Sequence, residues 1–156
     1  MNIHQITRQF ILFAAAIRQA TSGEALSKKI GVHVTDAQAD ALRFLALNDN
    51  ATVGQISVGL GHTISGATKA VNRLEKLGWV KRHNGGDDHR TVYVNLTGEG
   101  KRLTGILLME TEQRMNRILS KLRPETRERL NSVIEEFLRD FIDDDQTASN
   151  LCVACG

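Results

Sequence analysis

The side chains that could do chemistry in this 156-residue chain are mostly basic and small polar groups in its middle third. Residues 52–102 carry eight basic and four acidic side chains, a net charge of +4. Residues 103–156 carry seven basic and ten acidic ones, a net charge of −3, so the +2 of the whole chain conceals the division. Because Lys and Arg neutralise phosphates, a polyanion such as a nucleic acid is expected to bind the middle third.

The polar side chains of this third follow the period of an α-helix. The segment from Thr63 to Gly78 has one apolar face, and Thr63 and Gly78 are typical residues for its start and its end. The opposite face carries Ser65, Thr68, Lys69, Asn72 and Lys76. Thr52 and Gln55 have the spacing of a capping box and begin a shorter helix, which Gly61 ends. Two helices joined by a tight glycine turn, the second with a basic outer face, predict a helix-turn-helix.

A β-hairpin is predicted directly after these helices. β-branched and aromatic residues at 79–82 and 91–96 flank a Gly-, Asn- and Asp-rich segment. A hairpin that follows a helix-turn-helix is a wing. Asp87, Asp88 and His89 at its tip could suggest a metal or acid–base site, but adjacent side chains on a hairpin tip diverge and no second cluster completes a ligand set.

The last residues contain a Cys-x-x-Cys motif, Cys152 to Cys155. Two thiolates supply half of a zinc or iron–sulfur site, so a metal- or thiol-responsive site completed elsewhere and a terminus without such a role are both open. Two cysteines at one end form no disulfide framework, which fits a cytoplasmic protein.

The apolar run 10–17 is too short to cross a bilayer, so no membrane is expected. Without a phosphate loop, nucleophile motif or paired carboxylates, neither an enzyme nor a cofactor is expected.

Further helices must position the middle third. The first is predicted over 3–20, where an apolar stripe is widened by Ile11 and Leu12. Residues 21–34 are predicted to be a connector, and Thr35 is expected to cap the helix that precedes the helix-turn-helix. Helices are also predicted at about 99–122 and, after Pro124, to Phe141. A helix with two apolar faces must bury both, for instance one on its own domain and one on a partner chain.

Motifs in register between about residues 34 and 103 resemble those of the MarR family, the multiple-antibiotic-resistance regulators. These motifs are Val34-Thr35-Asp36-Ala37-Gln38, the capped helix at 52–61, Arg73-Leu74-Glu75-Lys76-Leu77-Gly78-Trp79-Val80-Lys81-Arg82, Asp88-His89-Arg90 and Leu96-Thr97-Gly98-Glu99-Gly100. The flanking helices resemble the family's dimerisation region by type only.

The resemblance implies a mainly α fold with a small β-hairpin wing. A winged helix-turn-helix would occupy 35–96, and N- and C-terminal dimerisation helices would lie in 1–34 and 97–142, followed by an acidic, cysteine-containing tail at 143–156. In the implied homodimer, each recognition helix would enter a major groove of a double-stranded DNA operator, and each wing would reach a flanking minor groove.

The resemblance also implies which side chains meet DNA. They are Thr63, Ser65, Thr68, Lys69, Asn72, Arg73, His89 and Arg90, with Asp88 holding the wing. Lys and Thr suit phosphates, Asn can bind adenine through two hydrogen bonds, and Arg suits a narrow minor groove. For Arg73, contact with DNA and an ion pair with the neighbouring Glu75 are both open.

The resulting hypothesis is a cytoplasmic transcriptional regulator, more specifically a repressor. By resemblance, a small, often aromatic acid would bind between the dimerisation helices and the winged domain and release the operator. Two alternatives remain. One is a winged-helix adaptor between proteins without specific DNA binding, and the other is a metal- or thiol-responsive regulator that uses Cys152 and Cys155.

Overall fold

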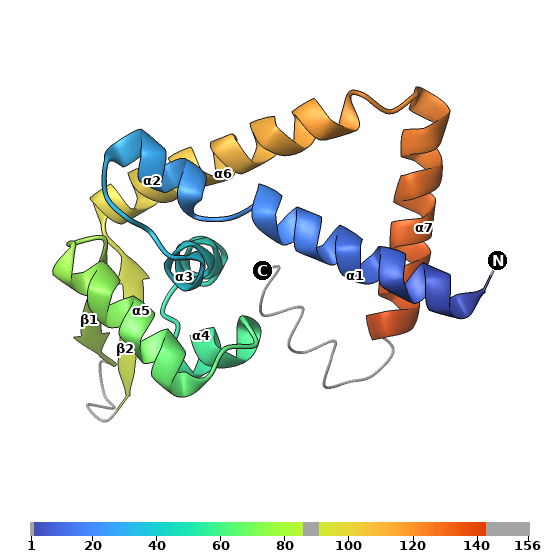
Figure 1. Ribbon diagram of the computed structural model, residues 1–156. Helices are drawn as coiled ribbons and strands as arrows, with labels where there is room; N and C mark the ends of the chain where they lie inside the picture. The colour runs from blue at the N-terminus through green and yellow to red at the C-terminus, as the bar shows by residue number, and fades with distance from the viewer. Residues whose placement is uncertain (1, 86–90, 143–156) are drawn as a thin grey trace.

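The computed structural model of the chain describes residues 2–85 and 91–142 (Figure 1). Within these ranges the elements are α1 (Ile3–Ala20), α2 (Glu24–Ile30), α3 (Asp36–Leu47), α4 (Val53–Gly59), α5 (Ile64–Lys76), β1 (Val80–Asn84), β2 (Val92–Leu96), α6 (Gly98–Leu119) and α7 (Pro124–Ile142). β1 and β2 pair antiparallel, from Val80 opposite Leu96 to Asn84 opposite Val92. The mainly α fold with a hairpin wing is therefore confirmed.

The hydrophobic core is centred on α3. Its Leu42, Phe44 and Leu45 are buried, and α5 and α6 pack against it with Leu74 and Leu107 among their buried side chains. The core is almost entirely aliphatic, as the composition requires, because aromatic residues make up 4% of the chain. This single core holds the helix-turn-helix and the hairpin in one rigid unit.

Threonine caps set the helix starts. The hydroxyl of Thr35 accepts a hydrogen bond from the backbone N–H of Gln38, whose side chain accepts one from the Thr35 N–H in return. Thr52 and Gln55 form the same capping box. Each box satisfies N–H groups that a helix start otherwise leaves without a partner. Both caps and the cap at Thr63 agree with the prediction from the sequence.

The predicted connector at 21–34 is wrong in part, because residues 24–30 form α2. Leu26 of α2 is fully buried, and α2 packs on α6. The local signals are a Glu24–Lys28 ion pair at i,i+4 and Gly31, which adopts φ +69° just after the helix. A seven-residue helix is marginal on its own, so the burial of Leu26 decides its formation.

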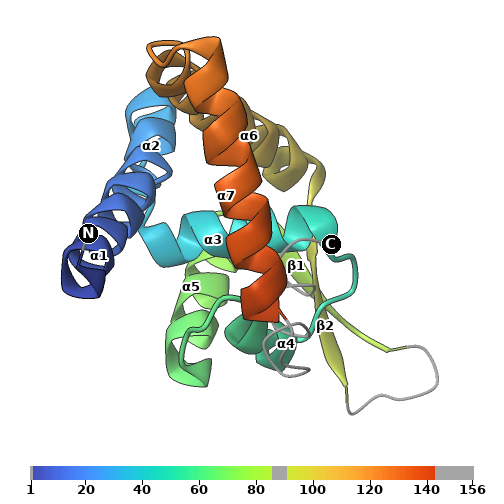
Figure 2. The same cartoon turned by 90° about the vertical axis from the view of Figure 1, so that its right-hand side faces the viewer.

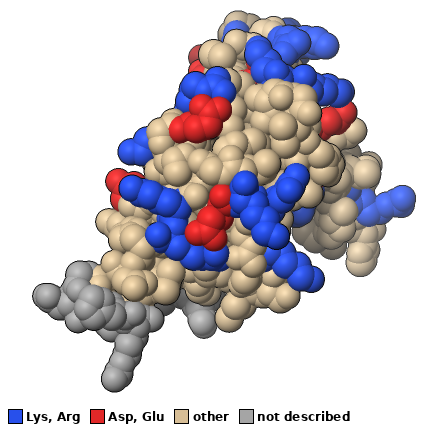
Figure 3. Space-filling view, turned by 90° about the vertical axis from the view of Figure 1, so that its left-hand side faces the viewer, with Lys and Arg blue, Asp and Glu red and all other residues tan. Residues whose placement is uncertain are grey.

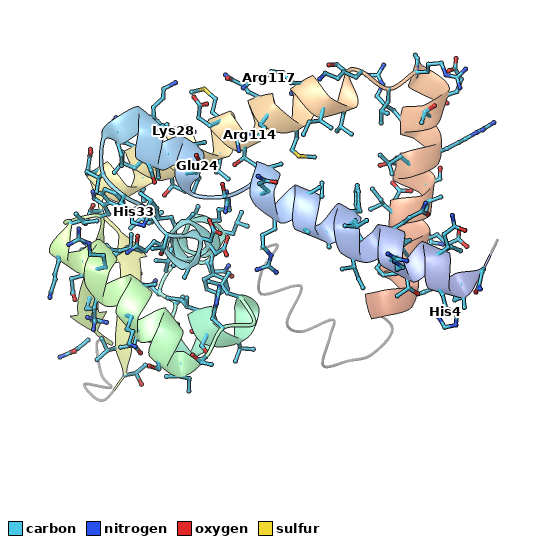
Figure 4. All side chains as sticks on the ribbon, viewed as in Figure 1. His4, Glu24, Lys28, His33, Arg114 and Arg117 are labelled. Atoms are coloured by element: carbon cyan, nitrogen blue, oxygen red, sulfur yellow. The ribbon has the colours of Figure 1, made fainter. Side chains whose placement is uncertain are left out.

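An ion pair joins α2 to α6, and hydrogen bonds join the end of α1 to α6. Lys29 donates to Glu110 at 2.6 Å, and this hydrogen bond holds the pKa of Glu110 below its usual value. Arg114 donates to the carbonyl oxygens of Gln19 and Ala20. In Figure 4, Glu24, Lys28 and Arg114 lie together where these elements meet. These contacts hold α6 against α2 and the end of α1.

The helices α1 and α7 lie outside the core. α1 crosses α7 rather than running alongside it (Figures 1 and 2), and Phe10 contacts Phe137 with ring centroids 5.3 Å apart and ring planes tilted by 35°. α1 has no buried residue, and Leu12 is 69% exposed. Although α1 is apolar, no helix in the described part of the chain is long and apolar enough to cross a membrane.

Candidate nucleic-acid interface

The exposed face of α5 is polar and basic. Ser65, Lys69, Asn72, Arg73 and Lys76 are exposed there, while Thr68 is half-buried. Ala67, Ala70, Val71 and Leu74 anchor the opposite face in the core. Figure 3 views the side of the molecule that carries α5 and β1 and shows Lys and Arg side chains gathered around acidic ones. The helical period predicted this division between the two faces correctly.

Two of the predicted contact residues already make hydrogen bonds within α5 and its cap. The hydroxyl of Thr63 accepts from the Gly66 N–H at 3.1 Å, so its own proton remains free to be donated. The hydroxyl of Thr68 donates to the carbonyl oxygen of Ile64 at 2.7 Å. A phosphate accepts hydrogen bonds, so Thr68 would have to give up this bond to contact one. Thr63 is therefore the better phosphate ligand of the two.

Arg82 of β1 joins the wing to α5. Its guanidinium donates through Nη1 to Glu75 and through Nη2 to Asn72 Oδ1, the latter at 2.7 Å. Glu75 is thus paired with Arg82, and within the described residues Arg73 takes part in no ion pair. Because Glu75 pairs with Arg82 instead, contact with DNA is the better of the two alternatives for Arg73. The role of Arg82 is not predictable from local sequence, because only the hairpin register brings it against a helix ten residues earlier.

The remaining predicted site residues belong to the tip of the wing and to the tail. Asp88, His89 and Arg90 at the tip of the wing, and Cys152 and Cys155 in the tail, lie outside the described residues. Strands β1 and β2, which lead to that tip, are in place on either side of it. Among the residues with a described position, no three His, Cys, Asp or Glu side chains come together as metal ligands.

A second site lies between α1, α7 and the helix-turn-helix. It is a cavity of about 880 Å³ with aromatic and aliphatic walls, including Phe10, Phe13 and Phe137. Arg18 of α1 also lines it, and in the described part of the chain this guanidinium has no ion-pair partner. The opposite wall includes Gly61 and His62, which form the turn before α5. The lining also includes the carboxylates of Asp36 and Asp40, of which Asp40 is paired with Arg43, so Arg18 is the lining cation that could meet a negative group on an otherwise apolar molecule.

Polar contacts connect the cavity wall to the long helices. His62 Nε2 lies 3.7 Å from the Asp40 carboxylate, which accepts from Arg43 at 2.9 Å. Arg43 also donates to the carbonyl oxygen of Thr21 and to Thr111 Oγ1. A molecule in the cavity would therefore contact the turn before α5 and affect the polar side chains that hold this turn against α1 and α6.

A helix-turn-helix with a basic outer face, followed by a hairpin, defines a DNA-binding protein of the winged-helix class. The sequence model of the MarR family matches residues 34–91. These residues, which form the winged helix-turn-helix, therefore match the MarR family of winged-helix transcriptional regulators. YfiV of Bacillus subtilis, described as an HTH-type transcriptional regulator, is 28% identical over 119 residues, which cover 76% of this chain and 74% of YfiV.

Solved structures share the fold. FabT of Streptococcus pneumoniae in complex with DNA superimposes with a TM-score of 0.73 at 17% identity, covering 89% of this chain and 99% of FabT. NadR in complex with 4-hydroxyphenylacetate gives a TM-score of 0.64 at 25% identity, covering 85% of this chain and 91% of NadR.

Proposed function

We propose that the chain is a homodimeric repressor that binds a double-stranded DNA operator and is released by a small aromatic acid. The observation that carries the proposal is the exposed, basic face of α5 beside the hairpin. Residues 35–96 would bind DNA, and residues 1–34 and 97–142 would dimerise. A dimer that covers a promoter blocks transcription without further contacts, which makes repression the simplest outcome of binding.

Each side chain of the α5 face has a role in this proposal. Lys69 and Arg73 would bind phosphates, together with Thr63 at the helix start. Ser65 and Asn72 would face base edges in the major groove. Arg90, with His89 beside it and Asp88 supporting the wing, would enter the minor groove, as the family resemblance implies.

The salt dependence of DNA binding tests the proposal. A specific regulator should lose affinity steeply between about 50 and 200 mM salt and should still prefer one sequence. The variants Lys69→Ala and Arg73→Ala should each weaken binding to all duplexes and lower the salt slope by about 1 for each lost phosphate contact. Lys121→Ala, which removes an equally exposed charge after α6, is the control and should change neither quantity.

Binding that is insensitive to salt and to sequence would contradict the proposal and favour the adaptor hypothesis. The metal- or thiol-responsive alternative predicts zinc bound to the purified protein and lost in Cys152→Ser. Equal, substoichiometric zinc in both proteins would remove that alternative.

The cavity between α1, α7 and the helix-turn-helix is the proposed effector site. Phe10, Phe13 and Phe137 offer aromatic surface, and Arg18 offers a cation for a carboxylate. NadR, whose fold this chain shares, binds 4-hydroxyphenylacetate. An acid bound against Gly61 and His62 would shift the turn before α5 and change the spacing of the two recognition helices in the dimer.

4-Hydroxyphenylacetate is the probe for this site. It should release DNA from the wild-type protein and from Arg8→Gln, which neutralises a guanidinium on the same helix away from the cavity lining. Arg18→Gln should bind DNA normally but resist release, because the carboxylate loses its counter-charge. If 4-hydroxyphenylacetate released DNA equally from all three proteins, Arg18 would have no role in the effector site.

A further inference from the structure

The contact between Arg82 and Asn72 determines which atoms of Asn72 are available to DNA. Arg82 reaches across from β1 and divides its guanidinium between two acceptors on α5, Asn72 Oδ1 and the Glu75 carboxylate. Asn72 and Glu75 are three residues apart and so lie on adjacent turns of one helix face. The Arg82 side chain is 27% exposed and that of Glu75 37%, so this fork is partly screened from water.

The chemistry of the two groups determines the orientation of the Asn72 amide. The oxygen and nitrogen of an amide are nearly equal in shape, but a guanidinium only donates hydrogen bonds. The atom of Asn72 that faces Arg82 must therefore be its oxygen. The amide nitrogen, with two N–H donors, is left on the other side, and no acceptor for it occurs among the described residues.

This orientation matters for base recognition. A free Asn side chain suits adenine, because its oxygen accepts from N6 while its nitrogen donates to N7. Arg82 occupies one lone pair of Oδ1 and its positive charge disfavours a second donor beside it, so the two N–H donors of Asn72 are the groups left for a base. Guanine offers two acceptors in the major groove, N7 and O6, and so matches two donors better than adenine does.

We propose that Arg82 is a positioning residue that turns the Asn72 amide toward DNA as a pure donor, so that α5 selects guanine at the base pair Asn72 meets. The inference rests on the proposed DNA-binding function and deepens it. It assigns the base preference at this position to a side chain of the wing strand that does not itself need to touch the base. It also replaces adenine, the base expected from Asn72 alone.

The test begins with a duplex selected by the wild-type protein from a randomised pool. Each base pair is then replaced in turn, and dissociation constants are measured for every replacement and for a scrambled duplex. Asn72→Ala should abolish the preference at one base pair, a loss of roughly 5- to 100-fold in discrimination. That base should be guanine.

Arg82→Lys keeps the positive charge but replaces the fork by a single ammonium, which cannot hold Asn72 and Glu75 in one geometry. It should abolish the preference at the same base pair and leave the affinity for the scrambled duplex within about twofold. In the double variant the losses should not add, because both changes remove one shared interaction. Lys81→Arg, a change of the same kind at the neighbouring exposed strand position, is the control and should keep the wild-type profile.

Asn72→Asp provides a test that does not weaken the contact with Arg82. The carboxylate still accepts from Arg82 but presents an acceptor to the groove, so the preference should change from guanine to cytosine, whose N4 donates. Additive losses in the double variant, full discrimination in Arg82→Lys, or adenine at the affected position would each overturn the inference. A wild-type protein that selects no sequence at all would overturn the proposed function and this inference with it.

Discussion

The first residue of α5, Ile64, has a large apolar side chain that is 66% exposed. It lies one turn before Thr68 and two turns before Asn72, so the three residues form a row along the proposed DNA face. A recognition helix contacts base edges mainly with its N-terminal residues, and an apolar side chain there suits the 5-methyl group of thymine. We therefore expect Ile64 to favour thymine at one position of the operator.

Replacing thymine by deoxyuridine at that position removes only the methyl group. The wild-type protein should bind the deoxyuridine duplex more weakly, by about 1 kcal/mol for one lost apolar methyl contact. Ile64→Ala should bind both duplexes with equal affinity. Val58→Ala, which shortens an exposed apolar side chain on α4, is the matched control and should keep the discrimination. A deoxyuridine duplex that binds as tightly as the thymine duplex at every position would refute this role for Ile64.

Site residues are predictable from the sequence only where local periodicity is enough to reveal them. Ser65, Lys69 and Asn72 were predicted from the helical period, which is a property of neighbouring residues. Arg82 and Arg18 were missed because their roles depend on contacts between separate elements. Arg82 reaches Asn72 through the hairpin register, and Arg18 lines the cavity because α1 crosses α7 next to the helix-turn-helix.

At the scale of elements, Gly100 determines how closely α6 approaches the wing. A Cβ at this position would lie 1.9 Å from the carbonyl oxygen of Trp79. The hydroxyl of Thr97, which caps α6 by accepting from the Gly100 N–H, also donates to the Gly78 carbonyl oxygen. The hydroxyl of Thr97 therefore holds the start of α6 against the turn that follows α5.

Gly100→Ala should push α6 away from Trp79 and lower the free energy of unfolding by about 1–3 kcal/mol, the usual cost of overpacking. Gly105→Ala is the matched control on the same helix, since a Cβ there meets nothing within 4 Å. It should instead stabilise the protein by up to about 1 kcal/mol through helix propensity. Urea unfolding followed by circular dichroism measures both changes. Equal stabilities of the two variants would mean that α6 can move without cost.

The elements that the sequence predicted well are those with local start and stop signals. The threonine caps at Thr35, Thr52 and Thr63 and the left-handed glycine at Gly78 mark their helices within a few residues. α2 was missed because its main stabilisation comes from burial of Leu26 in a core built by distant segments. A seven-residue stretch has too few positions for periodicity to reveal it.

At the scale of the whole molecule, α1 and α7 expose more apolar surface than a monomer usually tolerates. Ile3, Ile11 and Leu12 on α1 are 69%, 64% and 69% exposed and lie outside the cavity lining, whereas the exposed Val133 and Phe137 of α7 face the cavity. No side chain of α1 is buried within the chain. Contiguous apolar surface of this kind typically marks a protein–protein interface. We propose that a second copy of the chain covers this apolar surface, because a DNA-binding face of modest charge needs two subunits to bind an operator tightly.

Leu12→Glu should therefore convert the dimer into a monomer, because a carboxylate buried in an apolar interface without a partner is strongly unfavourable. Light scattering coupled to gel filtration measures the mass directly. Leu47→Glu makes the same change at a leucine that is 54% exposed at the end of α3, on the winged unit, and should remain dimeric. The monomeric variant should still bind scrambled duplexes weakly through its single α5 face but should lose its preference for the full operator. A monomeric wild-type protein with full operator affinity would separate DNA binding from dimerisation and refute this arrangement.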